Sequence, residues 1–186
     1  MRVLLTRSEE DSLRVAAHLK PHGITSIIWP VMKIEPVPFD GALPVKTDCV
    51  IVTSSAAVQT APRLLAKAMC PVFCVGDRTA AMARAAGAGD VRSAGGEVGD
   101  LVTLVAGAGV RSDLYLRGLD VATDLTAALS PHGIAVSERV TYAAVDAGAP
   151  ESDVAAALEA GEIDAVTIWS SRSAARFCSF VATNRQ

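Results

Sequence analysis

The chain has 186 residues, of which 51% are hydrophobic and 20% are charged, and its formal net charge is −3. This much apolar material excludes intrinsic disorder, and no apolar run approaches the roughly 20 residues that a membrane-spanning helix requires. Aromatic residues make up only 4% of the chain and acidic residues outnumber basic ones, which excludes a basic, base-stacking surface for nucleic acid.

The N-terminal segment predicts a strand, a helix and a second strand. An apolar run at residues 3–5 leads to Arg7, apolar positions at helical spacing follow in residues 13–19, and a Pro-His-Gly turn at 21–23 ends the helix before the next apolar run. The first apolar run is too short for a signal peptide and a charge follows it at once. We therefore expect a cytoplasmic protein.

The middle of the chain continues this alternation. Residues 34–39 have prolines at two positions and predict an extended crossover, whereas residues 48–55 form a β-branched run that ends in a Thr/Ser cluster. Beyond them we expect a strand at 71–75, an alanine-rich helix ending at Gly87, a short strand at 90–91 and a helix near 100–105. Strands that alternate with helices predict an α/β fold with a parallel sheet covered on both faces.

Two partial internal repeats relate the halves of the chain. The arginine-ending run at residues 4–7 and the Pro-His-Gly-Ile turn recur at an offset of 110, and the run at 48–55 recurs at an offset of 116. Residues 145–150 would form the return crossing. We therefore expect two α/β lobes joined by two strands, with lobe 1 formed by residues 1–36 plus 148–186 and lobe 2 by residues 40–145.

Hydroxyl clusters follow equivalent strands in the two predicted lobes. In open parallel sheets, ligands bind beyond the carboxyl ends of the strands, where helix N-termini attract anions. Helix capping is the alternative for either cluster taken alone, but the presence of one in each lobe favours a shared binding cleft. The candidate binding residues are Thr53, Ser54 and Ser55 in one cluster and Ser170, Ser171 and Arg172 in the other.

Arg7 and Arg117 stand at the ends of equivalent predicted strands, where a guanidinium group could hold a substrate carboxylate. Pairing with nearby acids, such as Glu9 or Asp120, is the alternative. Two strand-to-helix turns contain Gly76 and Gly95, whose missing side chains would let a ligand approach the backbone. Simple turns are equally compatible with these glycines, and neither turn has the glycine pattern of a dinucleotide or P-loop site.

Tyr142 lies near the end of the run that returns to lobe 1, where its phenol could donate a proton, although packing is the alternative role. Ser54 and Ser170 lack a basic partner in a recognisable nucleophile elbow, which argues against a hydrolase.

The histidines and cysteines do not form a recognisable site. The histidines lie on a helix and in the two Pro-His-Gly turns, away from the carboxyl ends of the strands, and are expected to be structural. The four cysteines lack C-x-x-C spacing, and those at 49 and 74 lie in apolar runs, so we expect buried thiols and neither a disulfide framework nor a zinc site.

Seven motifs together carry a family resemblance. They are V-L-L-T-R at 3–7, T-S-S-A-A-V at 53–58, V-G-D-R-T-A at 75–80, S-A-G-G-E-V-G-D-L at 93–101, L-Y-L-R-G at 114–118, E-R-V-T-Y at 138–142 and D-A-V-T-I-W-S-S-R-S at 164–173. In order and spacing, over essentially the whole chain, they resemble the uroporphyrinogen-III synthase family. The resemblance implies two flavodoxin-like α/β lobes joined by a two-stranded linker.

The resemblance also implies an activity. Enzymes of this family are lyases of porphyrin and heme biosynthesis, which convert the linear tetrapyrrole hydroxymethylbilane to uroporphyrinogen III with loss of water, inversion of ring D and closure of the macrocycle. The family uses neither a metal nor an organic cofactor and suggests a monomer. Tyr142 matches the tyrosine that assists departure of the hydroxyl, Thr79 matches the threonine of the V-G-x-x-T loop, and Ser54 and Ser170 match the serines that begin the cleft-facing helices.

The repeat carries one further expectation. At an offset of 116, the second copy of the unit that begins at residue 48 would continue to about residue 222. This predicts a form shortened in its terminal lobe, or one completed by another chain along an exposed sheet edge. Two alternatives to an active enzyme follow: an inactive shortened form and a non-catalytic bilobal relative that binds a ligand. The lack of an export signal disfavours a generic sugar or amino-acid binder.

Overall fold

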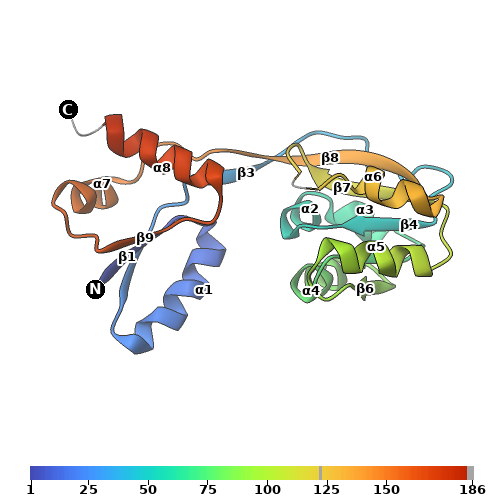
Figure 1. Ribbon diagram of the computed structural model, residues 1–186, viewed down its shortest axis with the longest axis horizontal. Helices are drawn as coiled ribbons and strands as arrows, with labels where there is room; N and C mark the ends of the chain where they lie inside the picture. Colours follow the sequence, from blue (N-terminus) through green and yellow to red (C-terminus); the bar gives the residue numbers. More distant parts are fainter. Residues whose placement is uncertain (122, 184–186) are drawn as a thin grey trace. The chain divides into compact units, whose positions relative to one another are not determined.

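The computed structural model describes residues 1–121 and 123–183, so residues 184–186 of the predicted lobe 1 lie outside the description, as does residue 122. The chain divides into two compact units, one of Met1–Lys33 with Val145–Gln186 and one of Ile34–Ala144 (Figure 1). Both units contain parallel strands and helices, which confirms the predicted α/β class. Within the described residues, no helix combines the length and apolar character that crossing a bilayer needs.

The six-stranded sheet, whose central strands lie in the second unit, has the strand order β3-β8-β7-β4-β5-β6. Its pairings β4–β5, β4–β7, β5–β6 and β7–β8 are parallel. Central strand β4 is buried along its whole length, as expected of an apolar run covered on both faces. The strands are β3 (Met32–Pro36), β4 (Cys49–Val52), β5 (Val72–Cys74), β6 (Val91–Ser93), β7 (Ser112–Gly118) and β8 (Ala135–Asp146).

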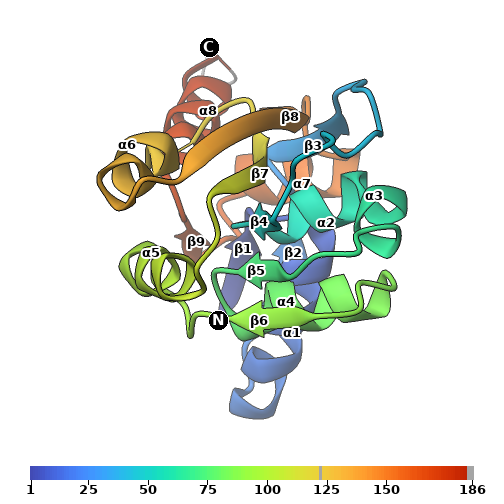
Figure 2. The same ribbon diagram turned by 90° about the vertical axis from the view of Figure 1, so that its right-hand side faces the viewer.

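Helices cover both faces of this sheet (Figure 2). Successive residues of a strand point to opposite faces, so Val50 and Val52 pack on one helical layer while Cys49 and Ile51 pack on the other. The first layer contains α2 (Ser55–Thr60), α3 (Pro62–Ala66) and α4 (Asp77–Ala85), and the second contains α5 (Val98–Gly107), α6 (Leu125–Leu129) and the 3₁₀ turn η2 (Ser130–His132).

The first unit contains a smaller parallel sheet with the strand order β2-β1-β9. On one face, Leu4 and Trp29 pack with residues of α7 and α8, and the rings of Trp29 and Phe180 meet edge to face at 4.8 Å. The elements are β1 (Arg2–Leu5), α1 (Glu9–Leu19), η1 (Lys20–His22), β2 (Thr25–Ile28), α7 (Ser152–Glu159), β9 (Ala165–Thr167) and α8 (Ser171–Thr183).

The internal repeat is visible in the backbone. Each Pro-His-Gly sequence forms a 3₁₀ turn closed by a glycine with a positive φ, +70° at Gly23 and +71° at Gly133. A Cβ at Gly23 would meet nothing within 4 Å, so the left-handed backbone rather than lack of space requires glycine there. The three histidines are exposed, His18 on the first helix and the other two in these 3₁₀ turns.

The predicted burial of two cysteines is also confirmed. Cys49 and Cys74 are fully buried in neighbouring strands, and desolvation raises the pKa of their thiols to about 12 and about 11. Both thiols therefore stay protonated at neutral pH and behave as small apolar groups.

Candidate active site

A cavity of about 220 Å³ lies at the carboxyl ends of β4 and β7, in the second unit. Parallel neighbours end at the same edge of a sheet, which is where open α/β sheets bind ligands. Of the predicted site residues, the structure brings together Thr53, Ser54 and Tyr142 around this cavity. The other lining residues are Val98, Tyr115, Gly118, Asp120, Val121, Thr123 and Leu125.

The ring of Tyr142 occupies the space that Gly118 leaves free. The two residues are paired across β7 and β8 at a point where the register shifts. A Cβ at Gly118 would lie 2.7 Å from Cζ of Tyr142 and 3.0 Å from its hydroxyl oxygen. Only glycine therefore allows the phenol to stand at this edge of the sheet.

Tyr115 is a second phenol on the same cavity. Its hydroxyl lies 2.9 Å from Oγ1 of Thr53, and its side chain is 3% exposed. Burial raises the pKa of Tyr115, so the phenol is neutral around pH 7. This residue was not predicted from the sequence, because it lies within the apolar run of β7 and is therefore expected to be a core residue. Its hydroxyl group was the signal that could have indicated this residue, because the hydroxyl of a buried tyrosine usually forms a hydrogen bond with another polar group.

Ser54 and Ser55 are positioned by the start of α2. Ser54 is the N-cap, and its Oγ accepts a hydrogen bond from the N–H of Ala56 at 3.1 Å. Ser55 is the first helical residue. Ser54 thus combines the capping role with a place in the cavity wall, so the two interpretations of this cluster are compatible.

The V-G-x-x-T loop and the double-glycine turn lie at the ends of β5 and β6. Gly76 caps α4, and a Cβ there would come within 3.4 Å of Cα of Gly96. Gly95 is exposed with φ +87°, whereas Thr79 is buried in the first turn of α4. Among the described residues, these three predicted positions are not part of the cavity wall around Tyr142.

Both predicted arginines are held by acids. Nε of Arg117 lies 2.7 Å from Glu138, and its Nη1 donates to the carbonyl oxygens of Gly118 and Leu119 at 2.9 and 3.0 Å. Arg117 therefore fixes the backbone at the end of β7, next to the Tyr142 ring. Arg117 pairs with Glu138 and Arg7 pairs with Asp11. The sequence did not indicate either of these two acids; it suggested Asp120 and Glu9 as possible partners.

The remaining predicted residues form a separate group in the first unit, at the ends of β1 and β9. Arg7 pairs with Asp11 at 3.1 Å and lies 5.0 Å from the ring centroid of Trp169. Oγ of Ser170 accepts a hydrogen bond from the N–H of Ser173 at 3.1 Å. Ser171 and Arg172 are exposed at the start of α8.

Across the described parts of the chain, no three His, Cys, Asp or Glu side chains gather where they could hold a metal ion. The polar groups that line the Tyr142 cavity are mainly hydroxyls: two phenols, two threonines and a serine, together with the carboxylate of Asp120, and the N-terminus of α2 lies beside them. Such groups can donate protons and hydrogen bonds to oxygen atoms of a substrate.

Comparison with known proteins gives three findings. The family model of uroporphyrinogen-III synthase HemD matches residues 14–185. The fold is similar to the crystal structure of uroporphyrinogen-III synthetase from Helicobacter pylori, with 18% identity and a TM-score of 0.56 over 84% of this chain and 68% of that one. It is also similar to a mutant uroporphyrinogen III synthase from Thermus thermophilus, with 18% identity and a TM-score of 0.55 over 97% of this chain and 77% of that one.

The search of curated proteins gave no match. The two structural likenesses, at 18% identity, support the fold, whereas the family match spans nearly the whole chain. The chain therefore belongs to the uroporphyrinogen-III synthase (HemD) family.

Proposed function

We propose that this chain is a cytoplasmic lyase of tetrapyrrole biosynthesis that converts hydroxymethylbilane to uroporphyrinogen III. The observation that carries the proposal is the phenol of Tyr142, which stands over Gly118 in a cavity lined by hydroxyl groups. Family membership supplies the substrate, because the family model that matches the chain is that of the synthase.

The proposed role of Tyr142 is to protonate the departing hydroxyl. When the C–O bond of the hydroxymethyl group breaks, the oxygen takes the phenolic proton and leaves as water. The phenolate then recovers the proton that the macrocycle releases after ring D has inverted and the last bond has closed, so the enzyme is unchanged. General acid catalysis of this kind accelerates a reaction about a hundredfold or more. Positioning of the two substrate ends supplies the rest of the rate acceleration.

The substrate carries many carboxylates, and its proposed contacts are hydrogen-bond donors. Helix N-termini attract such anions, and α4 and α5 begin beside the ends of β5 and β6. We assign Thr79 a supporting catalytic role on α4, and we take the two units as the two lobes of the enzyme. The proposed binding residues are Arg7, Thr53, Ser54, Ser55, Gly76, Gly95, Arg117, Ser170, Ser171 and Arg172.

The decisive experiment is the conversion of freshly prepared hydroxymethylbilane by the purified protein, with separation of the product isomers. Without enzyme the bilane closes to the type I isomer, so formation of the type III isomer identifies the synthase. If only the type I isomer forms at the uncatalysed rate while the bilane binds, the chain is a binding relative or an inactive form and the proposal is wrong.

Gly118→Ala is expected to lower kcat about tenfold, because the new Cβ would lie 2.7 Å from Cζ of Tyr142 and must displace the ring. Steady-state kinetics on hydroxymethylbilane would measure the effect, with circular dichroism to check folding. The matched control is Gly99→Ala on α5, where a Cβ meets nothing within 4 Å and the activity should be retained. A Gly118→Ala protein with the wild-type kcat would show that the position of this ring is unimportant.

Tyr115→Phe is expected to lower the free energy of unfolding by about 1 kcal/mol, because the buried hydroxyl bonded to Thr53 is lost. A double-mutant cycle with Thr53→Val, measured by urea unfolding, would isolate the interaction. The double variant should be less destabilised than the sum of the single variants. Strict additivity would mean that the two hydroxyls do not interact in solution.

A further inference from the structure

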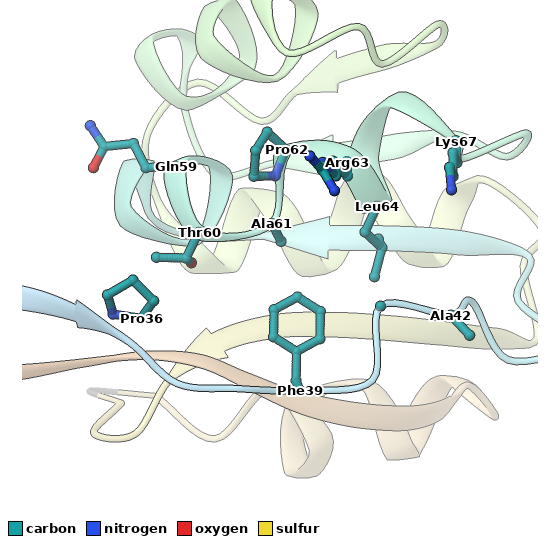
Figure 3. A pocket seen from close by; sticks show the side chains of 11 residues that line it. Pro36, Phe39, Ala42, Gln59, Thr60, Ala61, Pro62, Arg63, Leu64 and Lys67 are labelled. Atoms are coloured by element: carbon teal, nitrogen blue, oxygen red, sulfur yellow. The ribbon is translucent and has the colours of Figure 1, made fainter.

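The second unit has another cavity, larger than the one at Tyr142, between the chain that follows β3 and the helices α2 and α3 (Figure 3). Its volume is about 730 Å³, within the range of small-molecule sites. Among the described residues, its lining shares no member with the lining of the Tyr142 cavity. This cavity, whose lining residues come from the segments 36–42 and 59–67, will be called the α3 groove.

The interior of the α3 groove is apolar. Phe39 rises from one wall and Leu64 points toward it from the helical wall, as Figure 3 shows. Ala61 and Pro62 extend the helical wall. Phe39 is partly buried and packs on the same core cluster as Leu64, so the floor of the groove is continuous with the core.

Hydrogen bonds hold the wall that carries Phe39. Nη1 of Arg139 donates to the carbonyl oxygens of Asp40 and Ala42, and the Asp40 carboxylate accepts the N–H of Ala42 at 3.0 Å. On the opposite wall, the hydroxyl of Thr60 donates to the carbonyl of Ala56 at 2.9 Å. Both walls are therefore ordered before a ligand arrives, which lowers the entropy cost of binding.

The charged side chains that line the α3 groove are both positive. Arg63 and Lys67 are four residues apart on and just after α3, so they stand on the same side of the helix. Both side chains are exposed, and neither forms an ion pair within the part of the chain that the structure describes. No aspartate or glutamate is among the described lining residues.

We propose that the α3 groove binds a small carboxylate with an extended apolar chain. The chain would lie between Phe39 and Leu64, and the carboxylate would bridge the guanidinium of Arg63 and the ammonium of Lys67. The two unpaired cations above an apolar floor are complementary to such an amphipathic anion, whereas a neutral apolar molecule would leave them without a partner. This site is independent of the proposed synthase activity.

Fluorescence titration with 11-(dansylamino)undecanoate tests the proposal on the full chain. The probe should bind saturably at one site, and its methyl ester, which lacks the charge, should bind about tenfold more weakly. Arg63→Gln and Lys67→Gln should each weaken binding about threefold and together about tenfold. Phe39→Ala should weaken it about tenfold while leaving the charges in place.

Lys46→Gln is the matched control, since Lys46 is an exposed lysine of the same unit outside the groove lining, and it should bind the probe as the wild type does. Equal affinity for the acid and its ester, or binding unchanged by the double charge variant, would overturn the proposal. So would a dimer, detected by sedimentation, that Phe39→Ala dissociates while the probe fails to bind, since the groove would then be a self-association surface.

Discussion

Asp113→Asn should raise the free energy of unfolding by about 4 kcal/mol at pH 8 and by less than about 1 kcal/mol at pH 4. The Asp113 side chain is 2% exposed, opposite Cys49 in the β4–β7 pairing. Neither of its carboxylate oxygens has a hydrogen-bond partner among the described residues. A buried carboxylate of this kind destabilises the fold whenever it is ionised, and an amide of the same shape removes the charge.

The sign of the pH dependence follows from the pKa of this group. Burial raises the pKa of Asp113 from its ordinary value of 3.8 to about 7 in the folded protein. The folded state therefore binds the proton more tightly than the unfolded state does. The contribution of this group to stability is greatest below pH 4 and is lost as the pH rises through about 7.

Urea unfolding at several pH values, followed by circular dichroism, would measure this difference. Asp48 provides an opposite control in the same region, since its exposed carboxylate accepts the N–H groups of Arg111 and Ser112 at 2.8 and 3.0 Å, and these bonds lower its pKa. The stability that Asp48 contributes is present at neutral pH and is lost as the pH falls through the acid range. Parallel pH profiles for Asp113→Asn and the wild type would contradict the interpretation of Asp113.

Tyr142→Phe should lower kcat for hydroxymethylbilane at least about tenfold while KM changes by less than about twofold. The ring that fills the space above Gly118 remains in the variant, so substrate contacts with its face persist. Only the proton that assists departure of the hydroxyl is missing. An interaction needed chiefly in the transition state affects turnover rather than binding.

Tyr115→Phe is the natural comparison, because the chain has two tyrosines and both line the same cavity. The hydroxyl of Tyr115 is bonded to Thr53, so its loss should cost stability and have the smaller effect on kcat. Single-turnover measurements with both variants would separate chemistry from product release. An unchanged kcat in Tyr142→Phe would exclude the proton-donor role, whereas the type III product from the wild type would still establish the synthase.

The order of elements could be read from the sequence because local patterns carry it. The apolar run that became β4, the Ser54 cap of α2 and the left-handed glycines of the two Pro-His-Gly turns depend on neighbours within a few residues. Parallel pairing followed from the alternation of strands and helices. The break between α2 and α3 was not predicted, although Pro62, which has no N–H to donate, begins the second helix there.

The candidate site was predicted only in part. The sequence indicated Thr53, Ser54 and Tyr142 because hydroxyl groups after strands and a motif resemblance mark them. Tyr115 and Gly118 were not predicted. Tyr115 lies in an apolar run and is expected to be a core residue, and a glycine such as Gly118 is common where a strand ends. The same limit applies to Asp113, which in a sequence is only one more acidic residue.

The sequence by itself determined the α/β class, the internal repeat and the family, since these rest on periodicity and on motifs in a fixed order. Only the tertiary structure decided which side chains meet: the ring of Tyr142 above Gly118, the Thr53–Tyr115 hydroxyl pair, the buried Asp113 and the two cations of the α3 groove. The physical reason is that partners and burial arise between strands and helices far apart in the chain, where pairing register and packing, rather than local pattern, place one side chain against another.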